Sequence, residues 1–192
     1  MPDSNAASGT LPLVMVAHPA ITLDLAYAGV GNFAGRAFYA EARALLRPEA
    51  AAALYLAADM VARLGLRLVL LDAYRPVAVQ RMFWDIRPDP MYVADPAIGS
   101  DHSRGTAVDL TLADAAGALD MGTAFDAAVE QSHHGRADIA AAAIGNRLIL
   151  RGVMEAAGFL ANPHEWWHYA LPGRPEFTLL DDRDQLLPLV PA

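Results

Sequence analysis

Cysteine is absent from the 192 residues of the chain. A disulfide framework is therefore excluded, and thiolates are unavailable as metal ligands. Any transition-metal site has to use histidine and carboxylate side chains instead. Basic residues are also scarce: 14 Lys and Arg stand against 22 Asp and Glu, for a formal net charge of −8. Because nucleic-acid binding needs a basic face, this balance argues against a nucleic-acid partner.

Long apolar runs are missing as well. Residues 11–20 are largely apolar, but Pro12, His18 and Pro19 interrupt them and no basic residue precedes them. This segment therefore does not look like a signal peptide. Elsewhere the sequence has no apolar run long enough to cross a bilayer. We expect a cytoplasmic protein with no membrane partner.

Length and composition favour one domain. A chain of 192 residues is within the usual size of a single domain, and a hydrophobic share of 55% is ample for a core. We predict an N-terminal arm over residues 1–20, which are polar or broken by proline, and one domain over residues 21–192. Within it, residues 21–47 are rich in glycine and aromatic side chains, which favours irregular structure with short strands lining a pocket.

Helical and strand patterns are mixed along the chain. The clearest helix covers residues 48–64, where Pro48 suits the first position, Glu49 and Arg63 suit the helix dipole, and Gly65 suits the stop. Further helices are predicted over 76–84 and 139–157, strands over 66–72 and 106–112, and an extended segment within 159–171. Because these elements do not alternate regularly, the predicted class is α+β.

Residues 100–109 contain two candidate metal ligands. His102 and Asp109 are seven positions apart, and Gly105 between them permits a sharp bend before the predicted strand begins at Thr106. A loop ligand and a strand ligand can then converge on one point. Alternatively, His102 is a surface histidine and Asp109 a charge at a strand edge. An unpaired carboxylate in a buried strand is costly, however, and a metal ion removes that cost.

A second stretch, residues 165–168, contains Glu165 and His168 on either side of two tryptophans. A helical turn would put Glu165 and His168 on one face and a regular strand would put them on opposite faces, so the pattern leaves their geometry open. The indoles of Trp166 and Trp167 provide a dry wall on at least one side, although simple core packing is the more ordinary role for Trp166.

The two stretches together indicate a catalytic metal centre. His102, Asp109 and His168 supply three ligands, which leaves the fourth position of a tetrahedral zinc ion open for water. Glu165 is an additional carboxylate close to the last ligand, and an unbound carboxylate beside such a water can act as general base.

Arg75 follows a predicted buried strand, where a guanidinium is costly unless it faces a cleft or a carboxylate. It is either a structural arginine in a salt bridge or a donor that stabilises a developing oxyanion, and the neighbouring metal motif favours the second role. His133 and His134 have a metal-like composition, but adjacent residues rarely point at one ion. We expect them to be structural or to support the metal ligands.

With these residues in view, the chain resembles the zinc D-alanyl-D-alanine dipeptidases of the vancomycin-resistance type. These belong to a wider group that includes D,D-carboxypeptidases, phage L-alanyl-D-glutamate peptidases and hedgehog-like domains. The wider group shares Ser-x-His followed by Asp seven residues after the His, and a distal Glu-x-x-His. The dipeptidase subgroup is matched further by residues 72–76 (Asp-Ala-Tyr-Arg-Pro), 102–112 and 132–134, and the resemblance runs in register over about residues 20–170.

The resemblance implies a fold and a set of residue roles. The fold would be a small central antiparallel sheet flanked by helices. Zinc would be bound by His102, Asp109 and His168, with Glu165 as general base and Arg75 as oxyanion donor. For the substrate, Ser100 would hold the carboxylate, Asp126 the ammonium, and Tyr27 and Tyr39 would close a small pocket. Asp126 has a competing role as the N-cap of a helix beginning at residue 127.

The implied reaction is zinc-dependent hydrolysis of D-alanyl-D-alanine to two D-alanines. The chain departs from the family in having shorter loops within residues 35–39 and 84–100, and in having Asp101 where the family has serine. The shorter loops leave open a muropeptide D,D-carboxypeptidase or L,D-endopeptidase. A non-catalytic hedgehog-like zinc module is a third alternative, but it would not need both Glu165 and Arg75. The sequence makes no prediction of oligomeric state.

Overall fold

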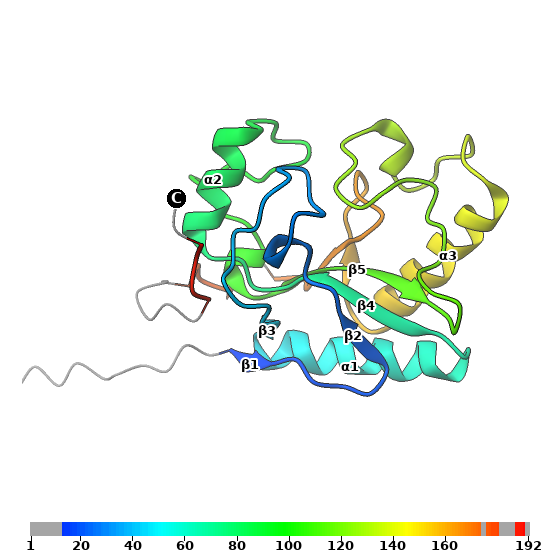
Figure 1. The fold of residues 1–192 in the computed structure, drawn as a ribbon. Coiled ribbons are helices and arrows are strands. Elements are labelled where there is room, and N and C mark those ends of the chain that lie inside the picture. Colours follow the sequence, from blue (N-terminus) through cyan, green and yellow to red (C-terminus); the bar gives the residue numbers. More distant parts are fainter. Residues whose placement is uncertain (1–12, 174–175, 181–186, 191–192) are drawn as a thin grey trace, which may run out of the picture.

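The computed structural model describes residues 13–173, 176–180 and 187–190 (Figure 1). A five-stranded sheet forms its centre, in the order β2-β4-β5-β7-β6. Its strands are β2 (Ile21–Leu23), β4 (Arg67–Asp72), β5 (Ala107–Ala113), β7 (His168–Ala170) and β6 (Leu160–Ala161). A separate two-stranded sheet pairs β1 (Val14–Met15) with β3 (Leu45–Leu46). The helices are α1 (Pro48–Arg63), α2 (Val77–Ile86), α3 (Ala141–Ala156) and the short 3₁₀ turns η1 (Ala26–Ala28), η2 (His102–Arg104) and η3 (Glu130–Ser132).

The α+β class is confirmed, but the expected all-antiparallel sheet is wrong at one edge. Strand β2 pairs parallel with β4, whereas the other neighbouring strands in the central sheet are antiparallel. The physical reason is the long connection between β2 and β4, which contains η1, β3 and α1. A connection of this length returns the chain to the same end of the sheet, as a parallel pair requires.

The predicted helices are present with small shifts at their ends. Helix α1 begins at Pro48 and ends at Arg63, and Gly65 beyond it has the left-handed φ of 73° that suits a helix stop. Pro76 precedes α2 in an extended conformation instead of opening it, and α3 covers the centre of the predicted 139–157 helix.

Helices α1 and α3 pack side by side on one face of the sheet (Figure 1). The side chains that β4 and β5 direct at these helices are apolar and fully buried: Leu68, Leu70, Val108, Leu110 and Leu112. Because successive strand residues point to opposite faces, the residues between them face away from these helices. Asp109 is one of those residues, and this alternation directs its carboxylate to the side of the molecule opposite the main core.

A bulge in β4 turns a second carboxylate to the same side. Leu70 pairs with Leu110, and the next pair is Asp72 with Asp109, so Leu71 is an extra residue in the ladder. In a regular ladder Leu71 would pair with Asp109, and Asp72 would then face the helices as Leu70 does. A bulge re-aims the side chain that follows it, and here it places Asp72 beside Asp109.

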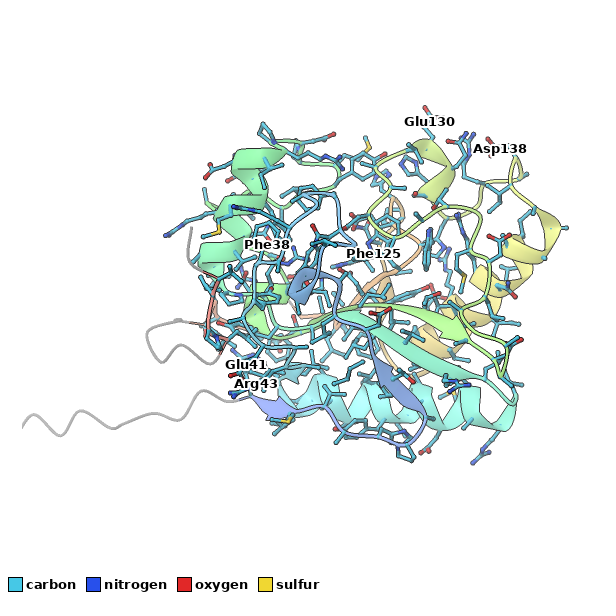
Figure 2. The ribbon with its side chains drawn as sticks, in the orientation of Figure 1. Phe38, Glu41, Arg43, Phe125, Glu130 and Asp138 are labelled. Atoms are coloured by element: carbon cyan, nitrogen blue, oxygen red, sulfur yellow. The ribbon has the colours of Figure 1, made fainter. Side chains whose placement is uncertain are left out.

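An aromatic cluster, consisting of Tyr27, Phe33, Phe38 and Phe83, packs on the side of the sheet away from α1. The ring centroids of Tyr27 and Phe83 are 4.6 Å apart, and those of Phe38 and Phe83 are 4.8 Å apart. Figure 2 shows Phe38 beside α2 and the charged Glu130 and Asp138 projecting from the surface at the other end. The cluster joins α2 to the irregular segment after β2.

The structure describes only part of the segment that was predicted as an N-terminal arm. Residues 1–12 lie outside the described residues, and from residue 14 the chain forms β1, antiparallel to β3. The division into an arm and a domain therefore stays a prediction. Among the described residues, none of the helices combines the length and the apolar character needed to span a membrane.

Candidate active site

A cavity of ≈ 220 Å³ opens on the polar side of the sheet. Eight of the nine residues predicted for the site line it: Tyr27, Arg75, Ser100, His102, Asp109, Asp126, Glu165 and His168. Tyr39 is not among the lining residues. Its backbone forms a bridge with Leu189, and its side chain is buried beside the aromatic cluster.

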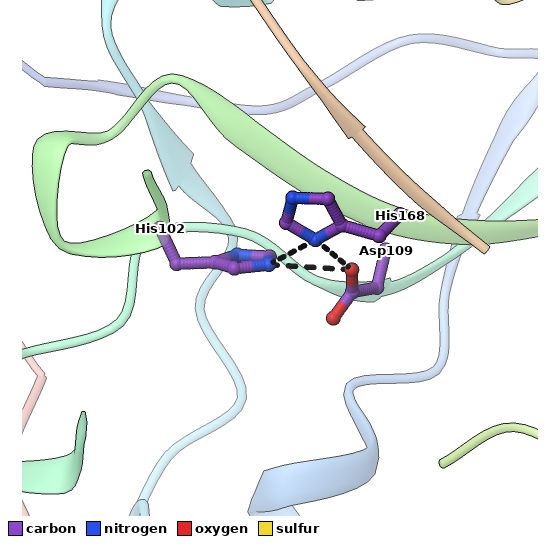
Figure 3. A group of neighbouring side chains, drawn as sticks. All are labelled: His102, Asp109 and His168. Carbon is purple, nitrogen blue, oxygen red and sulfur yellow. Dashed lines mark hydrogen bonds and ion pairs between the residues drawn. The ribbon is translucent and has the colours of Figure 1, made fainter. Parts of the chain in front are cut away.

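Three candidate metal ligands converge at the floor of this cavity (Figure 3). His102 Nε2 lies 3.2 Å from Asp109 Oδ1 and 3.1 Å from His168 Nδ1, and the last two atoms are 2.9 Å apart. Ligand atoms around a tetrahedral zinc with bonds of about 2.0 Å lie about 3.3 Å apart. The donor set therefore fits one small divalent ion.

Local structure explains this convergence. Asp109 and His168 are directly opposite each other on the antiparallel strands β5 and β7. His102 is in η2, which ends at Gly105 with a φ of 73° before the chain enters β5. A residue with a Cβ would be strained at this φ, and its Cβ would also meet Leu13 Cδ2 at 2.7 Å, so both features favour the glycine from which the bend was predicted.

The tautomer of His102 suits metal binding. Its Nδ1 is 2.7 Å from the carbonyl oxygen of Ala73, to which it donates. Such a hydrogen bond to the outer ring nitrogen orients the ring and leaves the other nitrogen free as a ligand. Although burial opposes ionisation of Asp109, His102 and His168 hold the pKa of that carboxyl below its usual range.

Glu165 reaches the same cavity through a turn. The backbone N–H of His168 donates to the carbonyl oxygen of Glu165 at 3.2 Å, and this turn directly precedes β7. A turn of this kind brings residues three apart to one side, which answers the question that the sequence pattern left open. The carboxylate accepts a hydrogen bond from Asn162 Nδ2 at 2.7 Å. Burial raises the pKa of Glu165 to about 8.

Asp126 is part of the cavity wall and does not cap a helix. It has a left-handed φ of 61°, and residues 127–129 are irregular with no helix beginning at residue 127, so the alternative N-cap role is wrong. Its carboxylate accepts hydrogen bonds from the Tyr27 hydroxyl at 2.8 Å and the Phe33 backbone N–H at 3.3 Å. Burial raises the pKa of Asp126 to about 6.

Arg75 is buried between carboxylates and aromatic rings. Its Nε and Nη2 donate to Asp72 Oδ2 at 2.9 and 2.7 Å, and Nη2 is 3.6 Å from Asp109 Oδ2. The guanidinium carbon lies 4.5 Å from the centre of the Phe83 ring. Although burial opposes its charge, Asp72 holds the pKa of Arg75 above its usual range. The side chain thus combines the salt bridge and the cavity-facing position that the sequence presented as alternatives.

Three residues in contact with this machinery were missed by sequence reasoning: Asp72, Gln80 and Asn162. Asp72 belongs to the quoted Asp-Ala-Tyr-Arg-Pro segment, so its position was available but its role was not. Gln80 accepts a hydrogen bond from Arg75, and Asn162 donates one to Glu165. Neither amide carries a sequence signal, because each contact depends on how separate segments pack.

The remaining candidates have structural contacts. His133 Nε2 is 3.0 Å from the Tyr92 hydroxyl, and neither His133 nor His134 lines the cavity. Trp166 is buried, and its indole N–H donates to Thr123 Oγ1 at 2.9 Å. Trp167, in contrast, forms part of the cavity wall. The dry wall expected from the two tryptophans is therefore built by Trp167.

Two histidines and an aspartate with an adjacent unbound glutamate, at the floor of a small cavity, define a metallopeptidase site. A family model described as "D-ala-D-ala dipeptidase" matches residues 7–186, and the chain belongs to this family. It is 44% identical over 179 residues to the D-alanyl-D-alanine dipeptidase of Escherichia coli (strain K12), covering 92% of this chain and 93% of that protein. It is 34% identical over 174 residues to the Enterococcus faecium enzyme of the same name, covering 79% and 86%. Among solved structures it is similar to an LD-carboxypeptidase, LdcB, with a TM-score of 0.47 and 21% identity over 73% of this chain and 65% of that one.

Proposed function

We propose that the protein hydrolyses D-alanyl-D-alanine to two molecules of D-alanine with zinc as its cofactor. The observation that carries this proposal is the placement of Glu165 beside the convergent His102, Asp109 and His168, in a cavity whose wall contains Asp126. The relatives named for this activity, which match over most of the chain, support the choice of substrate.

His102, Asp109 and His168 would hold the zinc. When bound, zinc lowers the pKa of a water molecule and polarises a peptide carbonyl. Glu165 accepts a proton from the attacking water as the bond from water oxygen to carbonyl carbon forms, and it then delivers this proton to the amine nitrogen as the peptide C–N bond breaks. The N–H groups of Arg75 stabilise the negative charge that develops on the carbonyl oxygen.

Recognition of the two ends of the substrate follows from charge. The buried carboxylate of Asp126 binds the free ammonium of the dipeptide, and the Ser100 hydroxyl contributes to binding of its carboxylate. Tyr27 donates to Asp126 and holds that carboxylate in place. A site that pairs a buried carboxylate with a free ammonium selects against blocked peptides, because an acylated amine leaves the carboxylate without its partner.

The test compares D-alanine release from D-alanyl-D-alanine and from N-acetyl-D-alanyl-D-alanine by the zinc-loaded protein. Selective cleavage of the free dipeptide is the expected result. Equal or better cleavage of the acetylated substrate would reassign the protein to D,D-carboxypeptidase or endopeptidase activity and remove the ammonium-binding role of Asp126. Stoichiometric zinc without hydrolysis of either peptide would favour the non-catalytic module.

The identity of the metal and the cellular location are separate parts of this proposal. Zinc is chosen because two imidazoles and a carboxylate suit it, and metal analysis of protein purified without added metal tests that choice. The cytoplasmic location expected from the sequence stays a prediction, which cell fractionation tests.

A further inference from the structure

A buried amide side chain connects the active-site arginine to the cavity wall. Gln80, in α2, has 1% of its surface exposed. Its Oε1 accepts a hydrogen bond from Arg75 Nη1 at 2.9 Å, and its Nε2 donates to the carbonyl oxygen of Ala94 at 2.7 Å. Ala94 lies in the loop between α2 and η2 and lines the cavity. Gln80 therefore contacts both Arg75 and the cavity-lining loop.

The hydrogen bonds of Arg75 show what Gln80 contributes. Asp72 engages Nε and Nη2, and Gln80 engages Nη1. A guanidinium has five N–H donors in a rigid fork, so these contacts leave one donor on each terminal nitrogen. Asp72 binds Nε and Nη2 through a single oxygen atom, Oδ2, so with Asp72 alone the plane of the guanidinium could rotate about that oxygen. The contact with Gln80 at Nη1 removes that freedom.

We propose that Gln80 is a positioning residue, which fixes the orientation of the Arg75 guanidinium and couples it to the loop carrying Ala94. This inference rests on the proposed function, in which Arg75 stabilises the developing oxyanion. An oxyanion donor is effective when its N–H groups are already directed at the place where charge develops. A change at Gln80 should therefore lower kcat and leave KM nearly unchanged.

The experiment is a double-mutant cycle on the zinc-loaded protein with D-alanyl-D-alanine. Gln80→Met keeps the size of the side chain and removes both amide contacts, and we expect kcat to fall about tenfold with little change in KM. In the Arg75→Ala background, the same substitution should cause no further loss of kcat. Equal losses in both backgrounds would overturn the proposal, because they would show that Gln80 acts independently of Arg75.

A second substitution separates the two contacts of Gln80. Gln80→Glu keeps an acceptor for Arg75 Nη1 but removes the donor to Ala94, so kcat should be closer to wild type than in Gln80→Met. A loss as large as that of Gln80→Met would contradict the proposal, because it would show that an acceptor for Arg75 Nη1 at this position does not support turnover. Thermal unfolding of every variant identifies those that fail to fold, and Gln80→Glu keeps the test informative if Gln80→Met is one of them.

Val79→Ala is the matched control on the same helix. Val79 is fully buried one position earlier and does not line the cavity. We expect it to lower the melting temperature without the kcat effect of Gln80→Met. Turnover of D-alanyl-D-alanine by the wild type is measured first: its absence would count against the proposed function, whereas normal turnover with additive losses would count against Gln80 alone.

Discussion

The two faces of the central sheet differ in composition and in role, although the same strands form both. Toward α1 and α3, β4 and β5 present Leu70, Leu110 and other fully buried aliphatic side chains. Toward the cavity they present Asp72 and Asp109. Neighbouring residues such as Asp109 and Leu110 therefore belong to different parts of the molecule, one to the candidate metal centre and the other to the core.

In this sheet, the residues that carry the chemistry and those that stabilise the fold are therefore separate, even where they are neighbours in the sequence. The aliphatic face lowers the free energy of the fold by removing apolar surface from water. The polar face holds buried carboxylates that are costly unless they are paired with Arg75, the histidines or a metal ion. Substitutions on the cavity face should therefore lower activity, and substitutions on the aliphatic face should lower the free energy of unfolding.

Asp109→Ala should have the largest effect. It removes one of three metal ligands, so we expect the variant to lose stoichiometric zinc and all measurable hydrolysis of D-alanyl-D-alanine. Metal analysis after gel filtration, together with an assay for D-alanine, measures both. Retention of one zinc per chain by this variant would show that the ligand set is wrong.

Arg75→Ala should lower kcat by about a hundredfold or more, because it removes an oxyanion donor that acts mainly in the transition state. The change in KM should be smaller. Steady-state kinetics separates the two parameters. If KM alone rises and kcat is preserved, Arg75 contributes to substrate binding in the ground state, and Gln80 then has no oxyanion donor to position.

Binding of the free dipeptide should weaken in acid. The pKa of Asp126 is raised to about 6, so protonation below that pH removes the negative charge that binds the substrate ammonium. The ammonium itself stays protonated there, since α-amino groups have pKa values of about 8. KM should therefore be lowest between the pKa of Asp126 and that of the substrate ammonium, and it should rise about tenfold one pH unit below the pKa of Asp126. In Asp126→Asn, KM should be high at every pH. If KM of this variant still rises in acid as it does in the wild type, the group that titrates is not Asp126.

Leu110→Ala should have the smallest effect on activity and a large effect on stability. Truncation of a fully buried leucine costs about 2–5 kcal/mol of folding free energy. Below its melting temperature the folded variant should keep kcat within about twofold of wild type, in contrast to the neighbouring Asp109→Ala. Urea denaturation and kinetics on the same preparation test this contrast, and a parallel collapse of kcat would show that the two faces are not independent.

Much of the site could be predicted because its signals are local. His102, Gly105 and Asp109 lie within one loop and strand, and the helix at residues 48–63 has its start and stop residues in the sequence. The cavity-lining placement of Asp126 came from the family resemblance.

What could not be predicted depends on contacts between distant segments. The direction of Asp72 follows from a one-residue register shift against β5, and a shift of that kind leaves no mark in the periodicity. The parallel pairing of β2 depends on the path of a long connection. Tyr39 was expected in the pocket, but it is not among the lining residues and its side chain is buried beside the aromatic cluster, which segments far apart in the sequence build.

The most direct test of the account is to measure zinc content and D-alanyl-D-alanine turnover in Glu165→Ala. Glu165 is proposed as the proton acceptor beside the metal and not as one of its ligands. The account predicts that this variant keeps one zinc per chain and loses turnover. Loss of zinc would make Glu165 a ligand, and turnover near that of the wild type would remove it from the reaction; either result would contradict the proposed arrangement.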